Sequence, residues 1–192
     1  DTLWVGDVYA EELARRLFSE TPIEFIDNPY FEDIRSDFAR QLSSAQPHPH
    51  EGGVRILFVA EPLSEHAAQV YRNPLHWGYT EFDALRFLQA NLATLGERVD
   101  EIVIRPHPSE NPTKYAAIAQ EIGASVRSGS DRSLIEEIVA CDIVVGCSSM
   151  AMVVGLLANK RVYSAIPPGG NPCALPHLEI KHLGAGRWPN VG

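Results

Sequence analysis

Residues 143–158 read IVVGCSSMAMVVGLLA. The run from Ile143 to Val145 is apolar and β-branched, which is typical of a parallel strand that is buried on both faces. Gly146 to Ser149 fit a tight turn, and Met150 to Ala158 predict a mostly apolar helix. A strand that turns directly into a helix is the first part of a βαβ unit, so this stretch predicts an α/β fold.

The same alternation extends in both directions along the chain. Each β-branched run is followed by a segment whose apolar residues recur at helical spacing. Right-handed crossovers between such units give a Rossmann-like, mostly parallel sheet with helices on both faces. We expect strands at 3–5, 23–26, 56–60, 102–104, 125–126, 143–145 and 161–165, and helices at 10–18, 31–42, 82–95, 112–122, 134–139 and 150–158.

Local signals set the boundaries between these elements. Residues 43–53, rich in Pro, His and Gly, predict a linker between an N-terminal βαβα segment, 1–42, and a larger domain, 54–192. Asn28-Pro29 predicts a turn, because the residue before a proline avoids the helical region. Ser130 or Asp131 fits the cap of the helix that begins near residue 134.

Composition excludes several classes of protein. The chain has 192 residues, 45% of them hydrophobic, so it can bury a real core. Its 16 Lys and Arg against 25 Asp and Glu give a formal net charge of −9, which argues against a nucleic-acid binder. No apolar run approaches the roughly 20 residues that span a bilayer, and no signal peptide is visible. Three cysteines without C-x-x-C spacing favour the reducing cytoplasm, with membrane contact only through partners.

The strand at 102–104 ends in an unusual sequence, Arg105-Pro106-His107-Pro108-Ser109-Glu110. In an open α/β sheet the ligand lies beyond the carboxyl ends of the strands, so this segment is a candidate site. The two prolines stiffen the backbone on both sides of His107. With Arg105 beside it, the imidazole could donate to a phosphate or protonate a leaving group. The alternative is a proline-rich turn with a surface histidine.

The turn from Gly146 to Ser149 is the second candidate. A helix N-terminus presents unpaired N–H groups and a partial positive charge, and Ser148 and Ser149 would add hydroxyl donors to the same anion. The alternative is that one serine only caps the helix, which is compatible with binding. Glu61 follows another strand and could face the same crevice or be a surface carboxylate.

Several motifs for other chemistries do not occur. The sequence has no G-x-G-x-x-G, no G-x-x-x-x-G-K-[ST] and no G-x-S-x-G, which weakens dinucleotide, P-loop and hydrolase interpretations. It also has no D-x-D, the usual carboxylate clamp for a metal–diphosphate pair. We therefore expect neither a metal nor a cofactor, and the charge of a leaving phosphate would be met by protein groups.

These residues resemble a known family. Arg105-Pro106-His107-Pro108, followed by Gly146-Cys147-Ser148-Ser149-Met150, is similar to the His-Pro and Ser motifs of bacterial GT-B glycosyltransferases that use cytidine-linked donors. These include sialyl- and polysialyltransferases, capsule Kdo transferases and CDP-glycerol glycerophosphotransferases. The stretches at 5–9 and 28–31 also look like the start of the C-terminal half of such surface-polysaccharide proteins.

The resemblance implies roles for individual residues. His107 would contact the donor phosphate and assist leaving-group departure, while Ser148 and Ser149 hold the same phosphate. Glu110 matches a position near the sugar or base of the nucleotide. The other residues that we assign to the phosphate site are Arg105, Pro108 and Gly146. The family is generally metal-independent, and its substrate is a nucleotide-sugar donor, here CMP- or CDP-linked.

One departure from the family is clear. A GT-B enzyme has two Rossmann-like domains, and its acidic base motif ends in Gly, whereas Glu32-Asp33 is followed by Ile34. We interpret the chain as the donor-binding half, with the glycan acceptor bound by a separate domain. Alternatives are a GT-B-like nucleotide-sugar 2-epimerase, a non-catalytic nucleotide- or glycan-binding module, and a purely structural α/β domain.

Overall fold

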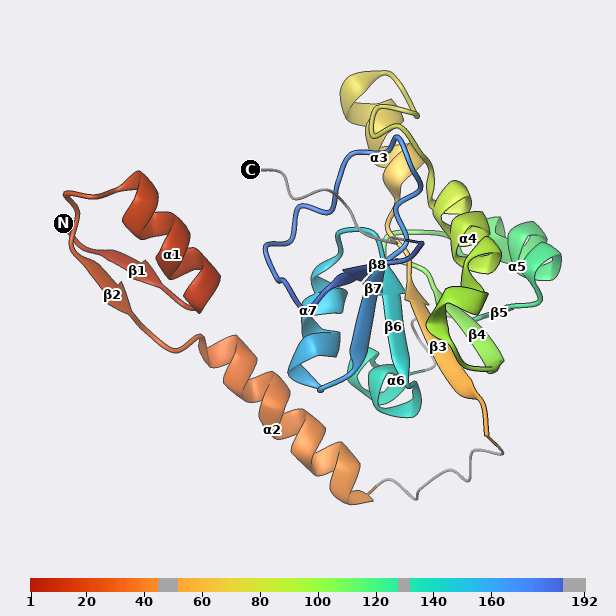
Figure 1. Ribbon diagram of the computed structural model, residues 1–192, viewed down its shortest axis with the longest axis horizontal. Helices are drawn as coiled ribbons and strands as arrows, with labels where there is room; N and C mark the ends of the chain where they lie inside the picture. Colours follow the sequence, from red (N-terminus) through yellow and green to blue (C-terminus); the bar gives the residue numbers. More distant parts are fainter. Residues whose placement is uncertain (45–51, 128–131, 185–192) are drawn as a thin grey trace. The chain divides into compact units, whose positions relative to one another are not determined.

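The computed structural model describes residues 1–44, 52–127 and 132–184. The chain divides into two compact units, Asp1–Ala45 and Gln46–Gly192 (Figure 1). The predicted helix caps, Ser130 and Asp131, and residues 45–51 of the predicted linker lie outside the described residues.

The smaller unit contains two parallel strands and two helices. Its elements are β1 (Leu3–Val5), α1 (Val8–Leu17), β2 (Ile23–Phe25) and α2 (Pro29–Ser44). Asn28 accepts a hydrogen bond from the Tyr30 N–H (3.0 Å) immediately before α2. Asn28 lies outside the helix, as expected of the residue before a proline, but Pro29 already belongs to α2, two residues before the predicted start at 31. Proline suits the first position of a helix, where its missing N–H has no partner.

The larger unit is built on six parallel strands in the order β5-β4-β3-β6-β7-β8. The chain enters at β3 in the middle, moves outward to β5, then crosses back to β6 and moves outward the other way. This is the order of a doubly wound, Rossmann-like sheet, so the predicted fold class is confirmed. The strands are β3 (Val54–Val59), β4 (Val99–Arg105), β5 (Ser125–Val126), β6 (Ile143–Gly146), β7 (Arg161–Ser164) and β8 (Lys181–His182).

Helices cover both faces of this sheet (Figure 1). Phe58 of β3 belongs to the core that also contains Leu85 and Ile118, on α4 and α5. The next residue, Val59, lies with Met152 of α7 on the opposite face. The helices are α3 (Leu63–Tyr71), α4 (Glu81–Ala90), η1 (Leu92–Leu95), η2 (Pro112–Tyr115), α5 (Ala116–Ile122), α6 (Leu134–Ala140) and α7 (Met150–Leu157).

Three local features differ from the sequence expectations. Helix α3 was not predicted, since it buries one alanine, Ala67, and lacks a side-chain cap. The single helix expected at 82–95 breaks at Asn91 into α4 and η1. Helix α6 is capped by Ser133, whose hydroxyl accepts from the Glu136 N–H (3.2 Å).

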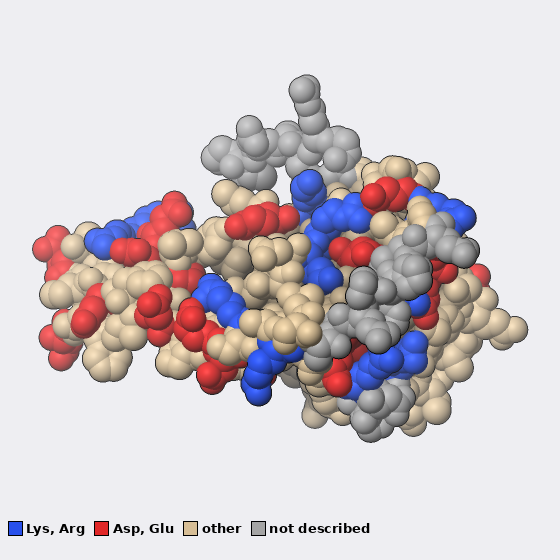
Figure 2. Space-filling view, turned by 90° about the horizontal axis from the view of Figure 1, so that it is seen from below, with Lys and Arg blue, Asp and Glu red and all other residues tan. Residues whose placement is uncertain are grey.

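Charged side chains of both signs are interspersed on the face shown in Figure 2. Among the described residues, some charged side chains pair between elements, such as Arg86 with Glu121 (2.9 Å) and Arg161 with Glu97 (2.5 Å). Exposed pairs of this kind contribute little to stability. Within the described residues, no helix combines the length and the apolar character that crossing a membrane requires.

Candidate functional site

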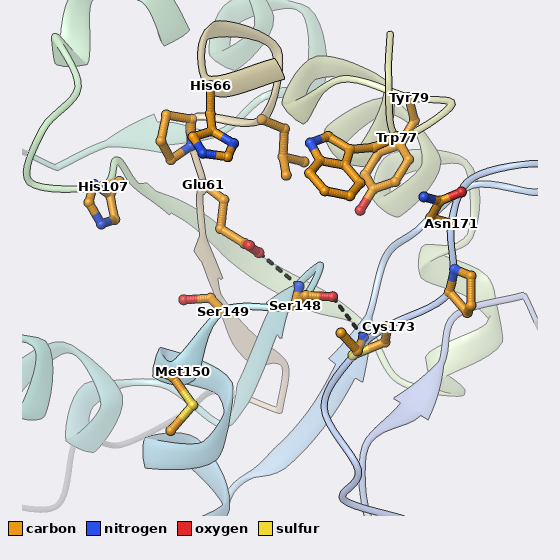
Figure 3. Close-up of a pocket in the computed structure, with 14 residues that line it drawn as sticks. Glu61, His66, Trp77, Tyr79, His107, Ser148, Ser149, Met150, Asn171 and Cys173 are labelled. Atoms are coloured by element: carbon orange, nitrogen blue, oxygen red, sulfur yellow. Dashed lines mark hydrogen bonds between the residues drawn. The ribbon is translucent and has the colours of Figure 1, made fainter. Parts of the chain in front are cut away.

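A cavity of the larger unit lies where the sheet order reverses, at the carboxyl ends of β3 and β6. It has a volume of about 710 Å³ and is lined from the loops that follow β3, β4, β6 and β7 (Figure 3). Ligands of doubly wound sheets bind at such a switch point, because the two diverging connections leave a crevice there. His107, Ser148 and Ser149 all line this cavity.

His107 follows β4, and its side chain is exposed. Its main-chain N–H donates to Glu110 Oε2 (2.8 Å), which closes the turn after Pro106. The Ser109 N–H donates to His107 Nδ1 (3.2 Å), and the Ser109 hydroxyl lies 2.7 Å from the same atom. Because Nδ1 accepts from this N–H, Nε2 carries the ring proton and is left to donate to a ligand.

The turn after β6 places two hydroxyls at the start of α7. Ser149 caps the helix, since its Oγ accepts from the Ala151 N–H (3.2 Å), and it lines the cavity as well. Ser148 Oγ accepts from the Ala174 N–H (3.1 Å), which joins this turn to the segment after β7. Each hydroxyl keeps its own proton for a further bond.

Gly146 is buried and has a steric role instead of a direct one. A Cβ at this position would lie 2.9 Å from Val59 Cγ2 and 3.0 Å from Met152 Sδ. Such contacts are shorter than van der Waals distance. Only glycine at this position therefore allows β6 to lie so close to the side chains of β3 and α7. Gly146 therefore allows the close packing from which the serine turn projects.

Glu61 is the acidic residue of the site, and the sequence left its role open. Its Oε1 accepts from the main-chain N–H groups of Ser148 (2.8 Å) and Cys147 (3.3 Å) (Figure 3). Burial raises the pKa of Glu61, and these amide bonds together with nearby His107 oppose that rise only in part. Its position directly after a strand made Glu61 a candidate in the sequence, and of the two alternatives left open there, the structure has it line the cavity.

An aromatic wall on the side of α3 and α4 was missed by sequence reasoning. Trp77 and Tyr79 line the cavity, and the Asn171 N–H donates to the Trp77 carbonyl (2.9 Å). A Cβ on Gly170 would lie 2.5 Å from the Tyr79 ring, so this glycine permits close packing of the two segments. Burial raises the pKa of Tyr79 well above its usual value, so its hydroxyl keeps its proton.

Besides Gly146, three other residues assigned to the phosphate site from sequence do not line the cavity. Arg105 forms a largely buried ion pair with Glu137 (2.5 Å) of α6 and also donates to the Arg132 carbonyl (3.0 Å). Glu110 is buried, and its carboxylate is bonded to other groups of the protein. Pro108 is exposed beside His107. His107 is therefore the residue of this segment that lines the cavity, and its neighbours in sequence lie outside the lining.

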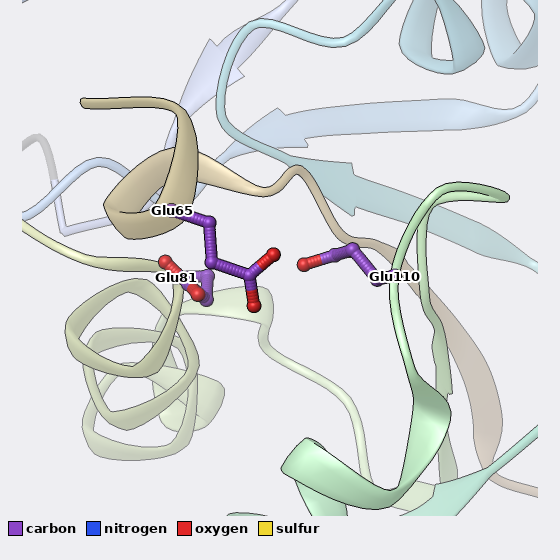
Figure 4. Close-up of side chains that lie close together, drawn as sticks. All are labelled: Glu65, Glu81 and Glu110. Atoms are coloured by element: carbon purple, nitrogen blue, oxygen red, sulfur yellow. The ribbon is translucent and has the colours of Figure 1, made fainter. Parts of the chain in front are cut away.

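Among the described residues, one group of three acidic side chains lies close enough together to suggest a metal site. Glu65, Glu81 and Glu110 each offer an oxygen, and these atoms lie within 4.8 Å of one another (Figure 4). The ammonium of Lys114 contacts all three, at 2.9, 2.8 and 2.5 Å. A protein cation therefore already lies among these carboxylates, where a metal ion would otherwise be held.

No protein-family model matches the chain, and no curated protein matches it either. Among solved structures it is similar to a β-Kdo 2,7-transferase of Thermosulfurimonas dismutans KpsC, with 16% identity, a TM-score of 0.49, and 91% of this chain and 50% of that chain covered. The corresponding values for the KpsC β-Kdo 2,4-transferase are 13%, 0.44, 82% and 50%. For POFUT1 in complex with GDP-fucose they are 10%, 0.34, 92% and 59%.

The chain spans about half the length of the KpsC structures, 50% in each case. Likeness at this level of identity and TM-score carries no argument about activity. The proposal below therefore depends on the cavity and the residues that line it.

Proposed function

We propose that the larger unit is the donor-nucleotide-binding domain of a metal-independent GT-B glycosyltransferase of bacterial surface or capsular polysaccharide synthesis, with a cytidine-linked donor. The observation that carries the proposal is the convergence of His107, from the β4 end, with Ser148 and Ser149, from the β6 end, on one cavity. The motifs that contain these residues are about forty positions apart in the sequence.

Each group has a part in binding the donor phosphate. His107 Nε2–H and the two serine hydroxyls are donors that suit phosphate oxygens. When the bond between the anomeric carbon and the phosphate oxygen breaks, the electron pair stays on the phosphate. Donors that are already oriented stabilise this charge without reorganisation. The acceptor hydroxyl forms the new glycosidic bond, and its proton would go to a base on a separate domain.

Glu61 fits this proposal because its carboxylate occupies the place that we assign to the phosphate. Its carboxylate occupies the main-chain N–H groups of Cys147 and Ser148, the groups that a bound anion would use at the start of α7. A phosphate that enters must displace this carboxylate or meet it in its protonated form. The raised pKa of Glu61 lowers the cost of protonation.

The rest of the cavity suits the remainder of a nucleotide sugar. A volume of about 710 Å³ is far larger than a phosphate needs and lies within the range of small-molecule sites. Trp77 and Tyr79 provide flat surfaces on which a base or a sugar ring can stack.

A thermal-shift and calorimetry panel with CMP, CDP, UDP and GDP tests the proposal. We expect the cytidine nucleotides to bind and to raise Tm. At a nucleotide concentration of 100 times Kd, binding should increase the free energy of unfolding by about 2.7 kcal/mol. A preference for uridine nucleotides would favour the epimerase alternative. Binding of no nucleotide at millimolar concentration would overturn the proposal. Binding without transfer, even when a neighbouring acceptor domain is supplied, would leave a non-catalytic module.

A further inference from the structure

Lys114 lies at the centre of a buried ionic cluster next to the cavity. Its ammonium contacts Glu65 of α3, Glu81 of α4 and Glu110 of the loop after β4 (Figure 4). The side chains of Glu81 and Glu110 are 1% and 0% exposed, and that of Lys114 is 16% exposed. Two carboxylates that are removed from water need this cation and further hydrogen bonds to remain charged.

The first connection from this cluster leads to His107. Glu110 Oε1 faces Lys114 and the Tyr115 hydroxyl, at 2.5 and 2.9 Å. The other oxygen, Oε2, accepts from the main-chain N–H of His107 (2.8 Å). One carboxylate thus joins the ammonium to the backbone of the histidine on the cavity wall.

The second connection leads to the neighbouring β3–α3 loop, since β3 and β4 are adjacent strands. Glu81 accepts from both the main-chain N–H of Ser64 (2.9 Å) and its hydroxyl (2.8 Å). Ser64 lies in the first turn of α3, directly after the cavity-lining residues Glu61, Pro62 and Leu63. The β3–α3 loop is therefore attached to the same ammonium as His107.

We propose that Lys114, through Glu110 and Glu81, is a positioning residue that fixes His107 relative to the neighbouring β3–α3 loop at the edge of the cavity. This rests on the proposed function, because it assigns Lys114 a part in holding the phosphate-binding histidine. Lys114 itself does not line the cavity and touches no ligand. Each hydrogen bond of a buried ion pair has a preferred direction, so the pair holds its partners in one arrangement. An apolar contact of the same size has no such directional preference.

The chain offers matched variants for a test. Lys114→Met removes the charge and keeps much of the side-chain volume, whereas Lys114→Arg keeps the charge. Glu65→Gln removes a partner of the same ammonium that is 58% exposed and accepts from neither the His107 nor the Ser64 N–H, so its contribution should be small. Glu110→Gln, which weakens the connection to His107 alone, serves if Lys114→Met fails to fold.

The first measurement is hydrogen exchange of single main-chain N–H groups in the full chain. In Lys114→Met we expect exchange at His107 and Ser64 to accelerate on the order of tenfold or more, the equivalent of weakening a charge-assisted hydrogen bond. Val144, in the centre of the sheet, should keep its protection. Lys114→Arg should restore much of the protection, and Glu65→Gln should leave it close to that of the unmodified chain.

The second measurement is CMP affinity by calorimetry in a double-mutant cycle. Glu110→Gln should weaken CMP binding in the unmodified chain and cause no further loss in His107→Ala, because it acts through that histidine. Unchanged exchange at both N–H groups in Lys114→Met would overturn the positioning role, as would fully additive losses in the cycle. If CMP does not bind at all while exchange responds as described, the proposed function fails and the positioning of His107 relative to the β3–α3 loop stands.

Discussion

The two strand ends that form the cavity are built in different ways. The β4 end is a six-residue loop that is held by charge: Arg105 pairs with Glu137, and Glu110 pairs with Lys114. The β6 end is a tight turn that is held by backbone bonds and steric fit, with Gly146 packed between two strands and a helix. At β4, the charged neighbours leave one side chain, that of His107, lining the cavity, whereas at β6 the Ser148 and Ser149 side chains line it directly beside main-chain N–H groups.

This difference predicts how substitutions at each strand end affect binding and stability. At the β4 end, replacing the functional side chain should affect binding and not stability. At the β6 end, backbone geometry and function are joined, so substitutions should affect stability first. Four variants separate these expectations, in order of decreasing effect.

Replacing His107 by Ala should cause the largest change. We expect CMP affinity to fall about 10- to 100-fold, because a hydrogen bond to a charged group is lost. The Tm should stay nearly constant, since the side chain is exposed. Calorimetry and thermal unfolding measure the two effects. His76→Ala, an exposed histidine outside the cavity lining, is the control, and equal affinity losses in both variants would contradict a specific role for His107.

Gly146→Ala should destabilise the larger unit by about 1–3 kcal/mol, because the new Cβ overlaps Val59 and Met152 in a packed core. Denaturant unfolding measures this change. Gly96→Ala is the contrasting control: its Cβ would meet no atom within 4 Å, so any loss there comes from its positive φ of 72° alone. If Gly146→Ala were fully as stable as the unmodified chain, the steric account of the β6 end would be wrong.

Ser149→Ala should lower stability by about 1 kcal/mol through loss of the α7 cap. Ser149→Asp restores a capping acceptor and places a negative charge in the cavity. We expect Ser149→Asp to unfold like the unmodified chain and to bind CMP more weakly than Ser149→Ala. Equal CMP affinity in the two variants would show that Ser149 is a cap and nothing more.

Glu61→Gln should have the smallest effect at low pH and a growing one as the pH rises. The pKa of Glu61 is raised, so its carboxyl is neutral below that pKa and becomes an anion on the Ser148 N–H as the pH passes it. CMP affinity of the unmodified chain should therefore fall, relative to that of Glu61→Gln, with increasing pH.

Calorimetry of both proteins from pH 4 to pH 8 gives the Glu61 comparison, and the difference between the two curves removes the titration of the phosphate itself. A constant difference would contradict displacement of Glu61 by the ligand.

The sequence indicated several residues of the candidate site. The residues whose role it could not decide have partners that are distant in the chain. His107, Ser148 and Ser149 were identified because proline flanks and a strand–turn–helix pattern are local signals. Arg105 and Glu110 do not line the cavity, and the sequence could not show this, since their partners, Glu137 and Lys114, come from other elements. The role of Glu61 could not be settled, because its contacts with Cys147 and Ser148 span 86 and 87 positions.

The sequence by itself determined the α/β class, most of the strands and the stiff histidine loop, because periodicity and proline chemistry act over a few residues. Only the tertiary structure decided the strand order, which brings the β3, β4 and β6 ends to one cavity. It also decided which charged groups are consumed inside the protein, as in the Lys114 cluster. Burial and pairing depend on contacts between distant segments, and no short stretch of the chain encodes them.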